Sequence, residues 1–100
     1  MPEKTVQVRR YQLTPGDLPK FLEWWQHTMV PAREAYGYTI EFGVAVHDRS
    51  EFIWAVSLPL PQDEFLKKDA EWMASEERKR ALSTAVPLVK QRVNLAERIR

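Results

Sequence analysis

Residues 6–25, VQVRRYQLTPGDLPKFLEWW, decide the fold of this chain. A strand pattern runs into the turn Pro15-Gly16, and Asp17 then begins an amphipathic helix. Two alternating strands follow over 38–58 as a hairpin, and helical patterns lead to a last strand within 88–99. The order β-α-β-β-α-β predicts a ferredoxin-like α+β domain, with helices on one face of an antiparallel sheet.

Two details of the pattern predict where side chains point. Over 38–47 the alternation places one set of residues on one face (Tyr38, Ile40, Phe42, Val44, Val46) and the other set on the opposite face (Thr39, Glu41, Gly43, Ala45, His47). The apolar stripe of the first helix follows the α-helical period and consists of Leu18, Phe21, Leu22, Trp25, Met29, Ala32 and Tyr36. We expect the helix to kink or end at Pro31, which has no N–H to donate.

Composition limits the function classes. One hundred residues predict a single domain over 1–100, and the absence of cysteine excludes disulfides, thiolate metal sites and thiol catalysis. The net charge of +1 argues against nucleic-acid binding, and no run reaches the roughly 20 apolar residues of a membrane helix. No histidine pair has metal-site spacing and no glycine-rich phosphate loop exists, so we expect no metal and no cofactor. We expect a cytoplasmic protein.

The sheet face without helices predicts an assembly. That face still carries apolar residues on at least three strands, and a monomer rarely exposes so large an apolar surface. A second copy is the simplest cover, because two-fold dimers are the commonest assemblies of soluble chains. We therefore expect a homodimer in which two sheets pack face to face into a shared α+β barrel.

Scattered residues along almost the whole chain resemble one family. They are the R-x-Y of Arg9 and Tyr11, the stretches LTPG (13–16), FLEWW (21–25), AYG (35–37) and FIW (52–54), and WMASEER (72–78). This combination resembles the NIPSNAP-like family of dimeric α+β barrels. The resemblance implies the same dimeric ferredoxin-like barrel and a family of mostly unassigned function. It also implies a wider superfamily with cofactor-free monooxygenases, haem-degrading enzymes, isomerases and cyclases.

Candidate site residues are those that the predicted fold could bring between sheet and helices. Tyr11 and His47 are the candidates for handling a proton in catalysis, although His47 also suits a place at the rim. Arg9 and Arg78 are candidates for holding negative charge on a substrate. Aromatic walls would come from Trp25, Trp54 and Trp72, which serve equally well as core.

Asp69 interrupts the apolar face of the second helical region. A carboxylate there needs a partner, or its pKa must rise. Asp69 and Glu41 could join the polar groups of a substrate site, or Asp69 could form a structural ion pair with Arg78 or Arg9.

Two functions therefore follow as hypotheses. In the first, the interior binds a small apolar or aromatic molecule and performs cofactor-free oxygenation, isomerisation or cyclisation. In the second, the chain is a non-catalytic binding or interaction module with a structural polar cluster.

Overall fold

The computed structural model describes residues 3–100. The elements follow one another in the predicted order: β1 (Thr5–Gln12), α1 (Leu18–Trp24), the π-helical turn η1 (Trp25–Met29), α2 (Val30–Ala35), β2 (Thr39–Val46), the 3-10 turn η2 (His47–Arg49), β3 (Glu51–Leu58), α3 (Gln62–Ala74), α4 (Glu76–Leu82) and β4 (Lys90–Ala96). No helix within the described residues is both long and apolar enough to cross a bilayer.

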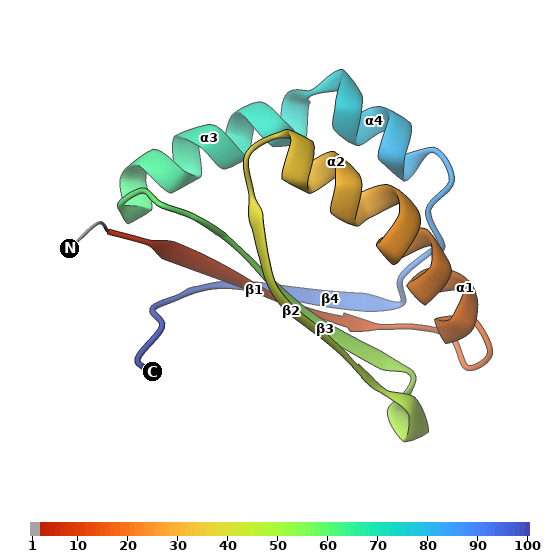
Figure 1. Ribbon diagram of the computed structural model, residues 1–100. Coiled ribbons are helices and arrows are strands. Elements are labelled where there is room, and N and C mark those ends of the chain that lie inside the picture. Colours follow the sequence, from red (N-terminus) through yellow and green to blue (C-terminus); the bar gives the residue numbers. More distant parts are fainter. Residues whose placement is uncertain (1–2) are drawn as a thin grey trace.

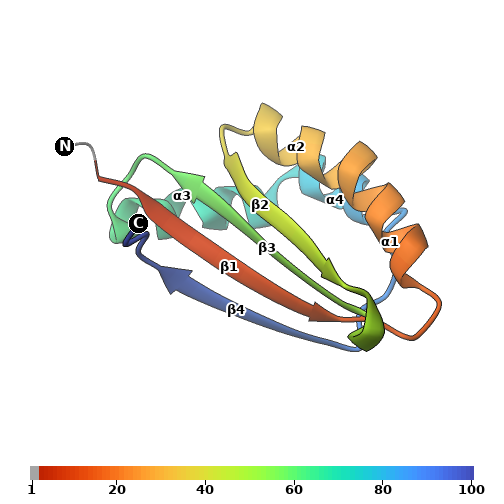
Figure 2. The same ribbon diagram turned by 60° about the horizontal axis from the view of Figure 1, so that its bottom comes forward.

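The strands form one antiparallel sheet of order β2-β3-β1-β4. All helices lie over one face of this sheet (Figure 1), and the opposite face carries no helix when the molecule is turned (Figure 2). The ferredoxin-like α+β fold predicted from the element order is thereby confirmed.

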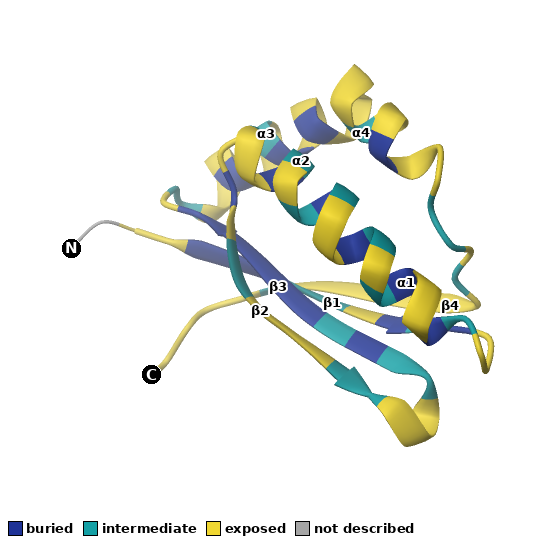
Figure 3. Ribbon diagram, turned by 45° about the vertical axis from the view of Figure 1, so that its right-hand side comes forward, coloured by how far each residue is buried: buried dark blue, intermediate teal, exposed yellow. Residues whose placement is uncertain are grey.

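Register between β1 and β3 defines the face that meets the helices. Gln7 pairs with Val56, Arg9 with Trp54, and Tyr11 with Phe52. The side chains of these pairs lie on the helix side, where the hydrophobic core includes Tyr11, Phe52, Trp54 and Val56. Polar Gln7 and Arg9 therefore point into the same layer as the core aromatics. Most of β3 is buried, whereas β4 at the sheet edge is largely exposed (Figure 3).

The predicted alternation of β2 is wrong beyond Glu41, because a β-bulge interrupts the strand. The register shifts between Ile40 and Phe42, so that Phe42 pairs with Ala55 and Gly43 with Trp54. After the bulge, Phe42 and Val44 lie on the open face and are 44% and 49% exposed. Gly43 faces the helices instead.

The helical segment continues through Pro31, so the helix does not end there. A π-helical turn precedes Pro31, and the N–H of Val30 donates to the carbonyl of Trp25 five residues earlier. A π turn holds more residues than an α turn, so residues four positions apart stay on the same side of the helix across this turn. Arg33 therefore takes the inward position after Met29, where the α-helical period had placed Ala32.

Gly43 gives a test of the bulge. A methyl group added there would lie 2.6 Å from Cη2 of Trp25, a ring already packed against Phe52 and Trp54. Overpacking of this kind destabilises by roughly 1–3 kcal/mol, so we predict that loss for Gly43→Ala in urea denaturation. Thr39→Ala, at an exposed position of the same strand, is the control and should change stability by less than about 0.5 kcal/mol. Equal stability of Gly43→Ala and the unaltered protein would contradict this packing.

Candidate functional site

A buried arginine lies at the centre of the interior. Arg33 is only 2% exposed, and its guanidinium carbon lies 4.6 Å from the ring centre of Tyr38, 4.8 Å from that of Trp72 and 5.5 Å from that of Trp54. Contacts of this length between a guanidinium and an aromatic face are attractive, and they are strongest when desolvated. The charge is thus enclosed by aromatic rings rather than by water.

The end of α2 couples Arg33 to Tyr38. Gly37 has a φ of +104°, a conformation that glycine adopts readily at a helix C-terminus. The turn lets the N–H of Tyr38 donate to the carbonyl of Arg33 at 3.1 Å. Both side chains therefore enter the interior from one short segment.

Asp69 on α3 is the counter-ion of this arginine. Its Oδ1 lies 3.4 Å from Nη1 of Arg33 and accepts a 2.7 Å hydrogen bond from the Tyr38 hydroxyl, while Oδ2 accepts a 3.4 Å bond from Nε2 of Gln7. The sequence predicts a partner for this carboxylate. The specific expectation of Arg78 or Arg9 was wrong, because the π turn brings Arg33 inward instead.

Burial shifts the pKa values of two of these groups. Burial, followed by the nearby positive charge of Arg9, lowers the pKa of Arg33 to about 10, because together they outweigh the attraction of Tyr38 and Asp69. Burial, followed by the hydrogen bond to Asp69, raises the pKa of Tyr38 well above its ordinary value. Tyr38 is therefore a neutral hydrogen-bond donor, and Arg33 remains charged at neutral pH in an environment that disfavours the charge.

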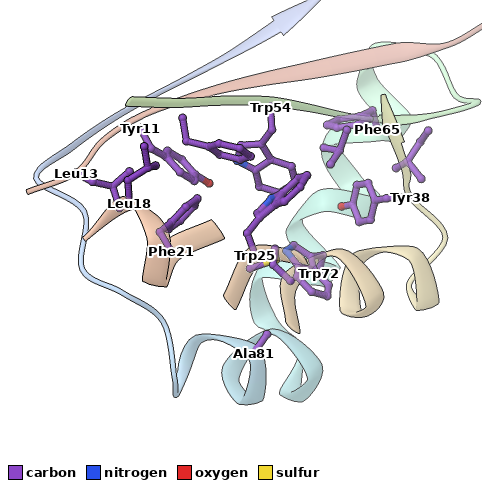
Figure 4. Close-up of a cluster of buried hydrophobic side chains, with 14 residues drawn as sticks. Tyr11, Leu13, Leu18, Phe21, Trp25, Tyr38, Trp54, Phe65, Trp72 and Ala81 are labelled. Carbon is purple, nitrogen blue, oxygen red and sulfur yellow. The ribbon is translucent and has the colours of Figure 1, made fainter. Parts of the chain in front are cut away.

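A cavity of about 200 Å³ lies beside this cluster, between sheet and helices. It is lined by aromatic, apolar and cationic side chains: Arg9, Tyr11, Phe21, Trp24, Met29, Arg33, Trp54, Trp72, Arg78, Leu82, Ala85, Val86, Leu88 and Gln91. Figure 4 shows Tyr11, Phe21, Trp54 and Trp72 in the layer between the sheet and the helices. No carboxylate and no imidazole belongs to this lining.

Arg9 and Tyr11 form a pair at the cavity wall. Arg9 donates from Nη1 to the Tyr11 hydroxyl at 3.2 Å and from Nε to Oε1 of Gln7 at 2.9 Å, and its guanidinium carbon lies 5.8 Å from the Trp54 ring centre. Because the Tyr11 oxygen accepts from Arg9, its own O–H is free to donate to another group. The pair offers a cation and a hydroxyl donor side by side.

Several buried donors around the cavity have no acceptor. Within residues 3–100, four buried nitrogen donors make no hydrogen bond: Nε of Arg33 and Nε1 of Trp25, Trp54 and Trp72. Buried donors of native proteins are nearly always paired. Arg33, Trp54 and Trp72 are all among the residues that line the cavity, whereas the unpaired nitrogen atoms themselves are buried.

The structure brings five of the predicted site residues to the cavity, namely Arg9, Tyr11, Trp54, Trp72 and Arg78. Asp69 lies behind Arg33 and is not part of the lining. Trp25 belongs to the adjoining core and packs against Phe52 and Trp54.

His47 and Glu41 lie apart from the cavity. His47 is exposed in η2 at the hairpin. The carboxylate of Glu41 lies on the open sheet face, 2.7 Å from Nζ of Lys4 and 3.0 Å from Nη1 of Arg98, and it accepts a 2.6 Å hydrogen bond from Ser57. The bonds from Lys4 and Ser57 lower the pKa of Glu41. Glu41 is thus an ion-pair centre of the other face.

Sequence reasoning missed Arg33 and Gln7. Gln7 could have been found from the two-residue spacing Gln7-Arg9-Tyr11, which places three polar groups on one strand face. Arg33 could have been found from the four-residue spacing Phe21-Trp25-Met29-Arg33. No group of three or more His, Asp or Glu side chains in the described part of the chain is arranged to hold a metal ion.

Asp69 supplies a test of the buried pair. Asp69→Asn leaves Arg33 charged without its counter-ion, and removing one partner of a buried pair costs roughly 3–5 kcal/mol. We predict a loss of that size in urea denaturation at neutral pH. Glu71→Gln, on the exposed side of the same helix, is the control and should cost at most about 1 kcal/mol. A loss for Asp69→Asn no larger than the control's would mean that Arg33 does not depend on Asp69.

Comparison with known proteins shows similarity in structure rather than in sequence. No protein-family model matches the chain, and no curated protein is significantly similar to it in sequence. An uncharacterised NIPSNAP domain protein from Burkholderia xenovorans superposes with a TM-score of 0.80 at 14% identity, over 94% of this chain and 93% of the other. A NIPSNAP family protein of unknown function from Agrobacterium tumefaciens gives 0.80 at 12% identity, over 95% and 87%.

An enzyme is also among the structural neighbours. SnoaB, a cofactor-independent oxygenase from Streptomyces nogalater, superposes with a TM-score of 0.69 at 12% identity, over 98% of this chain and 95% of that protein. Identities this low establish a shared fold and no shared chemistry. The chain has the ferredoxin-like α+β fold of the NIPSNAP domain proteins, which its sequence pattern resembles.

Proposed function

We propose that the cavity between sheet and helices binds a small, largely aromatic molecule. The carrying observation is that one partly open cavity combines aromatic walls with a few polar donors, among them Arg9 and Tyr11, as ligand sites do. The volume of about 200 Å³ suits a single substituted ring, since a cavity of about 150 Å³ in another protein holds one benzene molecule. Polycyclic ligands would need the cavity to expand.

Arg9 and Tyr11 give this site a chemical role. The Tyr11 hydroxyl donates to an oxygen substituent of the bound ring, and the adjacent Arg9 stabilises negative charge that develops there. Oxygenation, isomerisation and cyclisation without a cofactor can each start from an ionised, electron-rich substrate, and because the lining holds no carboxylate or imidazole, the substrate of this site enters already ionised. The cofactor-independent oxygenase among the structural neighbours supports this class of chemistry on this fold. His47 has no role in this proposal.

The second candidate function is binding without turnover. The observation that favours it is the lining itself, which offers neither a carboxylate nor an imidazole to remove a proton from a neutral substrate. In that case Asp69, Arg33 and Tyr38 are a structural cluster and the cavity serves as a receptor. Mass spectrometry of the ligand after incubation separates the two functions, since only an enzyme changes it.

We also propose that the open sheet face pairs with a second copy of the chain. Support comes from the apolar side chains that this face presents to solvent, including Phe42 and Val44 on β2. Light scattering at micromolar concentration should give the mass of two chains. Val44→Asp should give the mass of one chain, and Leu66→Asp, an equal change on an exposed position of α3, should leave the pair intact. A single-chain mass for the unaltered protein would refute the pairing.

Filling the cavity tests the proposed site. Ala85 lines the cavity, and the larger side chain of Ala85→Phe would occupy it. We predict that phenol, a neutral one-ring probe, binds the unaltered protein in isothermal titration and binds Ala85→Phe at least about ten-fold more weakly, a loss of roughly 1.4 kcal/mol. Ala74→Phe, at the exposed end of α3, is the control and should bind phenol normally. Unchanged affinity in a folded Ala85→Phe protein would exclude this cavity as the site.

A further inference from the structure

The cavity has an excess of positive charge. Arg9, Arg33 and Arg78 all line it, and no Asp or Glu does. Asp69, the one acid that contacts the cluster, is already paired with Arg33. Within the described residues, Arg9 and Arg78 form no ion pair, and their hydrogen bonds go to the neutral acceptors Gln7, Tyr11 and the carbonyl of Met73. Three cations thus surround a small space that holds no anion of its own.

Burial makes this imbalance unfavourable. A buried charge is tolerated when it is paired and fully hydrogen-bonded. Arg33 is 2% exposed, its Nε makes no hydrogen bond, and its contact with Asp69 is long at 3.4 Å. The depressed pKa of Arg33 reflects the same conflict, since burial and the neighbouring charge of Arg9 outweigh the attraction of Asp69. An anion in the cavity would offset this unfavourable burial of positive charge.

The donors of the lining specify the kind of acceptor. The guanidinium groups of Arg9, Arg33 and Arg78 belong to the lining residues, and the Tyr11 hydroxyl is a further donor at the cavity wall. An ionised carboxylate has two oxygens with about four acceptor sites and donates no hydrogen bond. It therefore complements a site whose polar groups are donors. Hydrogen bonds to an ionised acceptor are also shorter and stronger than neutral ones.

The rest of the lining indicates an aromatic body for this anion. Phe21, Met29 and Leu88 contribute apolar surface that a free inorganic anion such as phosphate would leave uncovered. We infer that the ligand of the cavity is a small aromatic carboxylate, with its charged group toward the arginines and its ring against the aromatic wall. This inference rests on the proposed ligand-binding function and narrows it to one chemical class.

The experiment compares two probes of nearly the same shape, benzoate and its neutral amide benzamide, by isothermal titration at low salt. Benzoate should bind at least about ten-fold more tightly than benzamide. Arg78→Gln should lower benzoate affinity by about ten-fold and lower benzamide affinity much less, because benzamide carries no charge to pair with the arginine. Arg80→Gln removes the same charge from the same helix outside the cavity, and it should affect neither probe.

Indole N–H signals provide a readout that needs no variant. In nitrogen–proton NMR spectra of the unaltered protein, benzoate should shift the Nε1–H resonances of Trp54 and Trp72, because the ring of a ligand in the cavity would lie against these two lining residues.

Each adverse result has a distinct meaning. Equal binding of benzoate and benzamide, or binding of phenol alone, would refute the carboxylate and leave the aromatic site standing. Equal losses in Arg78→Gln and Arg80→Gln, or indole signals that benzoate does not move, would refute it as well, because benzoate would then bind by surface charge. Failure of phenol, benzamide and benzoate together would overturn the ligand-binding function itself.

Discussion

The burial of the Arg33 guanidinium is the constraint on which the rest of the interior depends. A permanent charge removed from water requires a counter-ion, aromatic faces and hydrogen-bond acceptors in fixed places. Asp69 provides the counter-ion. The rings of Tyr38, Trp54 and Trp72 provide the aromatic faces. These groups come from different elements, so helix, sheet and hairpin are tied to one point. The acceptors remain incomplete, since Nε of Arg33 makes no hydrogen bond, and Arg33 also contributes to the lining of the cavity.

Local backbone irregularities create this arrangement. The π turn rotates α2 so that Arg33 points inward, and Gly37 then reverses the chain so that Tyr38 meets the guanidinium. On the sheet, the bulge after Ile40 turns Gly43 toward the helices, where the absence of a side chain admits the Trp25 ring. Such irregularities are frequent at functional sites, and both border the aromatic layer.

Much of the architecture was predictable from the sequence, because element order, turn residues and apolar periodicity all agree. Arg9, Tyr11 and Asp69 were also identifiable, since a polar residue on an apolar face stands out against its neighbours. Arg33 was missed because a regular α-helical period places it outside the stripe, and the four-residue spacing that ends at Arg33 is a signal only if a π turn is considered. The face of Phe42 was mispredicted for the same kind of reason, since strict alternation ignores the bulge. A cytoplasmic location and the role of His47 stay predictions.

The central inference is that the arginines and the Tyr11 hydroxyl at the cavity hold the carboxylate of an aromatic ligand. A crystal structure of the protein with 4-bromobenzoate tests this most directly, because the anomalous signal of bromine locates the ring. We predict bromine inside the cavity against the aromatic wall, with the carboxylate within hydrogen-bond distance of Arg33, Arg9 or Arg78. Bromine outside the cavity, or a carboxylate directed away from all three arginines, would contradict it.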